Sequence, residues 1–196
     1  MLQDLDATLV ALVKDKLTAL NVTISFAAPD QHFPPTGVTL PAIGFFLYDV
    51  RENFDLRTNQ WEQEKQANGV FTRKRPPVRV DCSYLVTAWP STASPNPAQD
   101  EHRLLGEVMK ALLAYRFIPA RYQKGALAGQ TPELYSRIMG ESQLQSLGEF
   151  WQAMGGKPKA ALSYGVTISV DVFAAETEGP AIARKDIRLK DKVPAA

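Results

Sequence analysis

One stretch of the chain, residues 78–117, constrains the fold more than any other because it joins a strand pattern to a helix pattern. Its first part reads VRVDCSYLVTAW, in which apolar residues occupy every second position from Val78 to Ala88. This period of two is typical of a strand with one buried face. The second part, EHRLLGEVMKALLAYRF, repeats apolar residues at three- and four-residue steps on one face of a helix: Leu105, Val108, Met109, Leu112 and Leu113. We expect these two apolar faces to pack together at the centre of the fold.

The rest of the chain adds further strands and helices to this centre. Period-two patterns or short apolar runs predict strands at residues 22–26, 42–50, 77–89 and 161–173, with a shorter strand within 134–139. Apolar stripes at helical spacing predict helices at residues 4–20, 100–116 and 143–154. The predicted fold class is therefore α+β, with a single mixed or antiparallel sheet and helices packed on one of its faces.

Two segments differ in character from this core. Residues 51–77 are polar, with a turn signal at Asn68-Gly69, and predict an extended hairpin or arm that has too few apolar residues for a core of its own. Residues 176–196 form a charged tail in which Ile187 and Leu189 alternate with basic residues. We therefore expect one domain over residues 1–175, which includes the arm, followed by the tail.

Length and charge place the chain in a broad class. Its 196 residues suffice for one domain with a substantial core, and its net charge of +1 gives no general attraction to nucleic acid or membranes. The basic run 73–75 lacks interleaved aromatic residues, which favours a solvated turn or an acidic partner over nucleic acid. The acidic N-terminus and the short apolar run AIGFFLY predict neither a signal peptide nor a membrane span. We expect the chain to fold in the cytoplasm.

The sequence is poor in groups that carry out catalysis. Its two histidines, His32 and His102, are far apart in sequence, and Cys82 lies on the apolar face of its strand, where a buried and unreactive thiol is expected. The sequence contains neither a zinc-binding spacing of histidines and cysteines nor a glycine-rich phosphate loop. We therefore predict no enzyme activity, no cofactor and no metal site, and keep a hydrolase that uses Cys82 or His102 as a less favoured alternative.

Several motifs together resemble a known family. The segments GFFLYDVREN, PVRVDCSYLVTAW and DEHRLLGEVMKALL occur in this order, preceded by LDATLVALVKDKL and followed by FWQAMGGKPKAALSYGVTISVDV. They resemble a family of domains that includes the tail-terminator, or cap, protein of extracellular contractile injection systems, the phage-tail-like particles of the antifeeding-prophage and Photorhabdus-virulence-cassette type. The resemblance spans residues 2–173.

The resemblance implies a tail-terminator-like fold and a structural function. A terminator forms a ring of copies, expected to be a hexamer, which ends growth of the inner tube and anchors the terminal sheath ring. The implied partners are other copies of the chain, the inner tube protein and the sheath protein, in a particle assembled in the cytoplasm and released from the cell. An adaptor or connector subunit of a phage-tail-like particle remains the alternative.

Candidate partner-binding residues lie mainly in the arm, at its borders and in the tail. They are Arg51, Glu52, Asn53, Arg57, Trp61, Arg73, Arg75, Trp89, Ile187 and Leu189. For residues 51–53, a salt-bridged strand end and an inter-subunit contact are equally good interpretations. Trp89 ends a core strand, so core packing is favoured there over an interface anchor.

Overall fold

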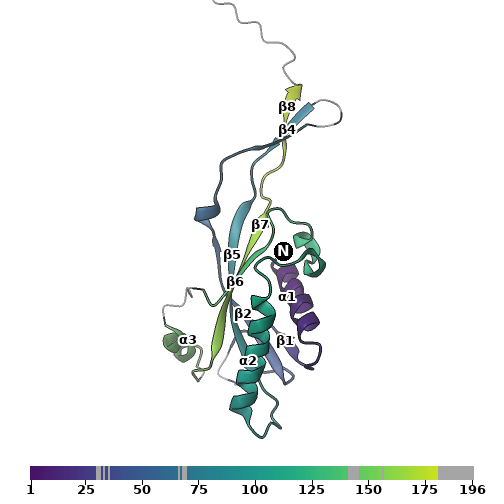
Figure 1. Ribbon diagram of the computed structural model, residues 1–196. Coiled ribbons are helices and arrows are strands. Elements are labelled where there is room, and N and C mark those ends of the chain that lie inside the picture. The colour runs from purple at the N-terminus through teal and green to yellow at the C-terminus, as the bar shows by residue number, and fades with distance from the viewer. Residues whose placement is uncertain are drawn as a thin grey trace, which may run out of the picture. The chain divides into compact units, whose positions relative to one another are not determined.

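The computed structural model of the chain describes residues 1–29, 32, 34, 36–65, 67, 70–140, 146–155 and 157–180 (Figure 1). These residues fall into two compact units. The main unit comprises Met1–Arg57 and Val78–Val170, and the small unit comprises Thr58–Pro77 together with the chain from Asp171 onward. Each unit is described by itself below.

The main unit is built on a five-stranded sheet with the strand order β1-β2-β5-β7-β6. Its three long strands, β2 (Ala42–Glu52), β5 (Val78–Trp89) and β7 (Ala161–Val170), are antiparallel neighbours. The edge strands are short: β1 (Thr23–Ser25) runs parallel to β2, and β6 (Tyr135–Ile138) runs antiparallel to β7. The predicted α+β class with a mixed sheet is confirmed.

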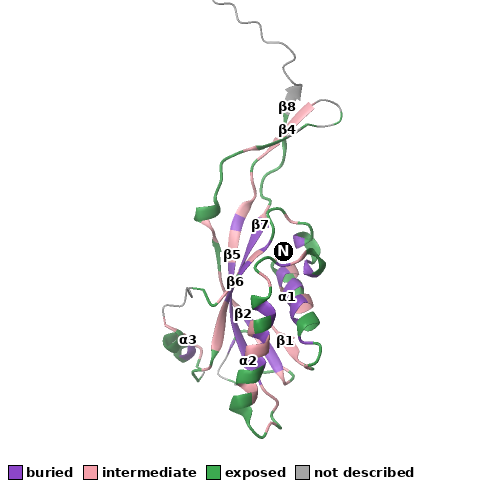
Figure 2. Ribbon diagram, in the orientation of Figure 1, coloured by how far each residue is buried: buried purple, intermediate pink, exposed green. Residues whose placement is uncertain are grey.

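Two helices, α1 (Leu2–Lys16) and α2 (Pro97–Leu113), lie on one side of this sheet (Figure 1). Their inward residues are buried, as the purple segments of Figure 2 show. The helices and the sheet share one apolar cluster, in which the largest side chains from the strands are Phe45, Tyr84 and Tyr164. The expected packing of the 78–117 strand and helix at the centre of the fold is thus observed.

The third helix, α3 (Leu147–Ala153), packs on the opposite face of the sheet, so the prediction of helices on one face is wrong for this element. The ring of Phe150 lies 6.1 Å from that of Phe46, and Trp151 is 1% exposed. The reason is that β2 is apolar on both faces, with Phe45 in the main cluster and Phe46 turned the other way. Strand β5 is likewise buried on both faces rather than half-buried, since Leu85 is also inaccessible.

Element boundaries differ from the predicted ones by a few residues. Helix α1 ends at Lys16 rather than at residue 20, and β7 ends at Val170 rather than at residue 173. Helix α2 begins at Pro97, where proline suits the first helical position, and Asp100 follows in the first turn. Of the predicted 143–154 helix, residues 143–145 lie outside the described residues.

The small unit is a three-stranded sheet with the order β3-β4-β8. Strands β3 (Glu62–Lys65) and β4 (Val70–Lys74), both within the segment predicted as a hairpin or arm, pair antiparallel. The hairpin unit begins at Thr58, because β2 continues to Glu52 and a 3₁₀ turn, η1 (Phe54–Leu56), follows it within the main unit. Strand β8 (Glu176–Pro180) pairs with β4 and was not predicted; its sequence ETEGP has none of the usual strand formers except Thr177.

Candidate functional site

A β-bulge near the end of β2 decides which side chains gather there. The pairing with β5 shifts between Leu47 and Asp49, so the alternation of side chains along β2 reverses its phase. Asp49 and Arg51 consequently lie on the face of the sheet that carries Ser83 and Asp81, away from the main apolar cluster. The bulge therefore places the charged end of β2 on the face of the sheet opposite α1 and α2.

Asp81 is the centre of the polar network that results. Its Oδ1 accepts a hydrogen bond of 2.6 Å from the Thr167 hydroxyl, and its Oδ2 accepts one of 3.0 Å from the Asn53 amide. The guanidinium of Arg137 lies 3.6 Å from the same Oδ2. Arg51, which faces Asp81 across the strands, pairs with Asp49 at 2.6 Å. These contacts fit the interpretation of residues 51–53 as a salt-bridged strand end, and leave the role of this segment in subunit contacts a prediction.

The turn after β2 exposes apolar side chains. Asn53 Oδ1 accepts from the Leu56 backbone N–H at 3.1 Å, which fixes the 3₁₀ turn. Phe54 is then 68% exposed, and Leu56 and Val50 are nearly half exposed. Arg57 Nε forms an ion pair with Glu52 Oε1 at 3.1 Å, and the guanidinium carbon of Arg57 lies 5.5 Å from the Phe54 ring centre. We call Val50, Phe54 and Leu56 the β2-end patch; exposed aromatic groups beside arginine are typical of interface hot spots.

The small unit carries a ladder of alternating cations and aromatic rings. The guanidinium carbon of Arg73 lies 4.5 Å from the Trp61 ring centre, and that of Arg75 lies 4.9 Å from the same ring and 5.0 Å from Phe173. Arg73 also pairs with Glu176 at 3.0 Å. The predicted contact residues Trp61, Arg73 and Arg75 are thus brought together, in a unit whose described residues include no buried apolar side chain.

Trp89 is only 7% exposed, which agrees with core packing. Its indole N–H donates to the Thr87 hydroxyl at 3.2 Å, and the Lys159 ammonium lies 4.3 Å from its ring centre. Lys159, with a side chain only 8% exposed, forms an ion pair with Glu101 of α2. The positions of the other two candidates, Ile187 and Leu189, lie outside the described residues.

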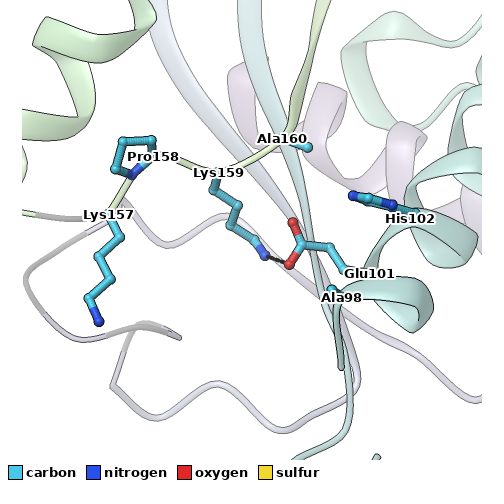
Figure 3. A pocket seen from close by; sticks show the side chains of 7 residues that line it. All are labelled: Ala98, Glu101, His102, Lys157, Pro158, Lys159 and Ala160. Carbon is cyan, nitrogen blue, oxygen red and sulfur yellow. Dashed lines mark ion pairs between the residues drawn. The ribbon is translucent and has the colours of Figure 1, made fainter. Parts of the chain in front are cut away.

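The Glu101–Lys159 pair borders a hollow of about 380 Å³, shown in Figure 3. The lining residues are Ala98, Glu101, His102, Lys157, Pro158, Lys159 and Ala160. Burial lowers the pKa of Lys159, and the Glu101 carboxylate opposes that shift. Buried lysines of this kind also occur in active sites, but this amine is held by a carboxylate, and Lys157 points away from the pair in Figure 3. The arrangement is that of a structural ion pair.

Neither the hollow nor the network assembles a metal site. No group of three or more histidine, cysteine, aspartate or glutamate side chains with metal-binding geometry occurs among the described residues. In the same part of the chain, no helix combines the length and the apolar character needed to cross a membrane.

The Cys82 thiol is expected to be unreactive in the folded chain. It is fully buried, and burial, followed by the neighbouring Asp81, raises its pKa to about 12. Because the thiolate is the reactive form, a maleimide should label the native chain at least roughly a hundredfold more slowly than the chain in guanidinium. A chain that carries Leu113→Cys serves as the control, since position 113 is 52% exposed and its new thiol should react at once. Rapid labelling of native Cys82 would contradict the expectation and reopen the hydrolase alternative.

The fold and these sites together define a class: an α+β domain whose exposed features are aromatic, charged and suited to contacts with other proteins. The chain belongs to the Pvc16 N-terminal domain family, whose model matches residues 4–184. This confirms the family suggested by the sequence motifs. No curated protein matches the chain.

Two solved structures share the fold. One is the sheath/tube terminator of an extracellular contractile injection system, PVC, in its extended state, with 22% identity and a TM-score of 0.68 over 100% of this chain and 65% of that one. The other is the tube-terminating cap of the anti-feeding prophage, AFP, with 27% identity and a TM-score of 0.61 over 95% of this chain and 59% of that one. The chain spans less than two thirds of the length of either protein.

Proposed function

We propose that the chain is a structural terminator of a contractile injection particle. In this function, copies of the chain form a ring, with six members as in the prediction, that ends growth of the inner tube and anchors the terminal sheath ring. The observation that carries the proposal is the family match over residues 4–184, together with the fold shared with a tube-terminating cap at 27% identity.

The geometry of the sheet supports a function in assembly. A protein that ends a filament must bind the last subunits and must not offer the same surface again, because an open head-to-tail contact would continue the polymer. The outer strands of the main sheet are short, three residues in β1 and four in β6, and β1 borders β2 over residues 42–44 alone. The rest of β2 carries a bulge after Leu47 and the charged residues Asp49, Arg51 and Glu52, and bulges and charges at a sheet edge discourage indefinite strand addition. Contacts at these edges can instead be made by side chains.

The proposed function requires no catalytic group, and a role without enzyme activity is part of the proposal. The candidate contact elements are the β2-end patch with Arg51, Glu52, Asn53 and Arg57, the Trp61–Arg73–Arg75 ladder, and the tail with Ile187 and Leu189. The proposed partners are the inner tube protein, the sheath protein and other copies of the chain. Assembly in the cytoplasm before release of the particle is part of the same proposal.

The test combines light scattering with electron microscopy of tubes. We expect the purified chain to form a closed ring, alone or on the tube end, and to shorten and narrow the length distribution of tubes assembled from the cognate tube protein. Tube protein alone is the control. Tubes whose lengths are unchanged, with the chain bound along or at the end of them, would contradict termination and favour the adaptor alternative. A chain that binds neither tube nor sheath would overturn the proposal.

A further inference from the structure

The end of β2 and the start of β6 lie at opposite edges of the main sheet, at the same height along the strands. Strand β1 pairs with β2 over residues 42–44 alone, so among the described residues β2 is the edge strand from Phe45 onward. Across the sheet, Arg51 is paired with Asp81, Asp81 with Thr167, and Thr167 with Tyr135. The end of β2 and the start of β6 therefore lie at the same level of the sheet, three strand spacings or roughly 14 Å apart.

Exposed apolar groups collect at these two edges. The β2-end patch lies at one edge, and at the other edge Phe117, 46% exposed, stacks edge to face on Tyr135 with 5.7 Å between ring centres. Met139, just past β6, is 53% exposed. We call Phe117, Tyr135 and Met139 the β6-edge patch. The other exposed large apolar side chains in the described part of the main unit lie at helix ends: Leu2, Leu113 and Leu147.

The backbone at the β6 edge is already partly used. The Ser136 N–H donates to the Arg116 carbonyl at 2.8 Å, and the Ile118 N–H donates to the Leu134 carbonyl at 3.0 Å. Segment 116–118 therefore covers the start of β6 and presents the Phe117 ring beside it. A partner at this edge would meet side chains rather than a free row of backbone groups.

The charges beside the two patches are complementary. Residues 49–57 hold three acids and two bases, and the acid next to Phe54, Asp55, is exposed. At the other edge the exposed charges are Arg116, whose guanidinium lies 5.5 Å from the Tyr135 ring centre, Arg137, and Glu133 two residues before Tyr135. The net charge is therefore −1 over residues 49–57 and +1 over these three residues, and opposite net charges at two edges of one chain suit contact between copies of that chain.

We propose that the β2-end patch of one copy packs against the β6-edge patch of the next copy of this same chain. Because the two surfaces differ, the contact is head-to-tail, and its repetition builds a ring if the rotation closes. The inference rests on the proposed function in that the ring is the one that the terminator would form. It assigns both faces of the contact to particular residues.

The test uses two single-cysteine additions, Phe54→Cys and Phe117→Cys, in the full-length chain. Native Cys82 is buried and does not interfere. A mixture of the two variants should form a disulfide-linked dimer under mild oxidation, whereas neither variant alone should do so. The double variant should give a series of disulfide-linked oligomers, the largest of which contains as many chains as the closed ring. The matched control uses Leu147→Cys in place of Phe117→Cys. Leu147 is 40% exposed, against 46% for Phe117, and lies outside both patches, so it should give no link to residue 54.

A second measurement separates this inference from the proposed function. Phe54→Glu and Phe117→Glu should each lower the fraction of chain in rings roughly tenfold or more, because each puts a charge where the proposed contact buries an aromatic ring. Leu147→Glu should leave that fraction unchanged. Rings that persist by light scattering without the 54–117 link would overturn the pairing of these edges and leave termination standing. Tubes of unchanged length, with the 54–117 link present, would contradict termination and support the pairing.

Discussion

Replacing Phe45 with alanine is expected to destabilise the main unit by about 3 to 5 kcal/mol, the usual cost of removing a fully buried aromatic side chain. Phe45 is 0% exposed and stands at the centre of an aromatic cluster. Its ring lies 6.2 Å from Tyr84 and 6.5 Å from Tyr164, both edge to face, and 6.0 Å from Phe26. The cavity would lie between the long strands and the helices, where neither can move inward without breaking sheet pairing.

Urea unfolding followed by circular dichroism measures this loss. The matched control is Leu113→Ala, which truncates a side chain that is 52% exposed and outside both patches and should change the free energy of unfolding by less than about 0.5 kcal/mol. Equal effects of the two substitutions would show that Phe45 does not occupy the core position described here.

Replacing Glu101 with glutamine is expected to cost about 3 kcal/mol near neutral pH. The substitution leaves Lys159 buried without its carboxylate, and an uncompensated buried charge is far more costly than a lost surface pair. The matched control is Glu107→Gln on the same helix. Glu107 pairs with Lys110 at 2.7 Å at the surface, so that loss should stay below about 1 kcal/mol.

The stability of the Glu101→Gln variant should recover in part as pH rises. Burial already lowers the pKa of Lys159 below 10.5, and removal of the Glu101 charge removes the effect that opposes this shift. At this lysine the unfolded chain then binds more protons than the folded chain as pH approaches 10.5, so the loss of stability relative to the natural sequence shrinks with pH. The raised pKa of Cys82 lowers the stability of both chains alike in this range and cancels in the difference. Unfolding curves of both chains at several pH values check the difference, and a difference that stays constant or grows with pH would contradict a buried, unpaired Lys159.

A double replacement separates burial from pairing in the same region. The chain with Glu101→Leu and Lys159→Met should lie within about 1 kcal/mol of the natural sequence, because an apolar pair of similar size avoids the cost of burying charge. A loss as large as that of Glu101→Gln would show that the ion pair itself is required.

Part of the candidate site could be found from the sequence and part could not. The sequence singled out Trp61, Arg73 and Arg75 one by one, and the β3–β4 hairpin brings them into one ladder because Glu62 pairs with Lys74. It gave no signal for Phe117 and Tyr135, which are separated by eighteen positions and meet through an isolated bridge. The same holds for Glu101 and Lys159, which come from distant segments and carry no motif.

The amino-acid sequence by itself determined the family, through the resemblance of its ordered motifs. It also determined the α+β class and the approximate limits of the long strands and helices, because these follow from local periodicity. Tertiary structure alone decided that α3 covers the second face of the sheet, that β8 joins the hairpin, and that a bulge turns Arg51 toward Asp81. The physical reason is that faces, register and edges depend on which distant segments pair. A pattern along one strand does not specify its neighbour.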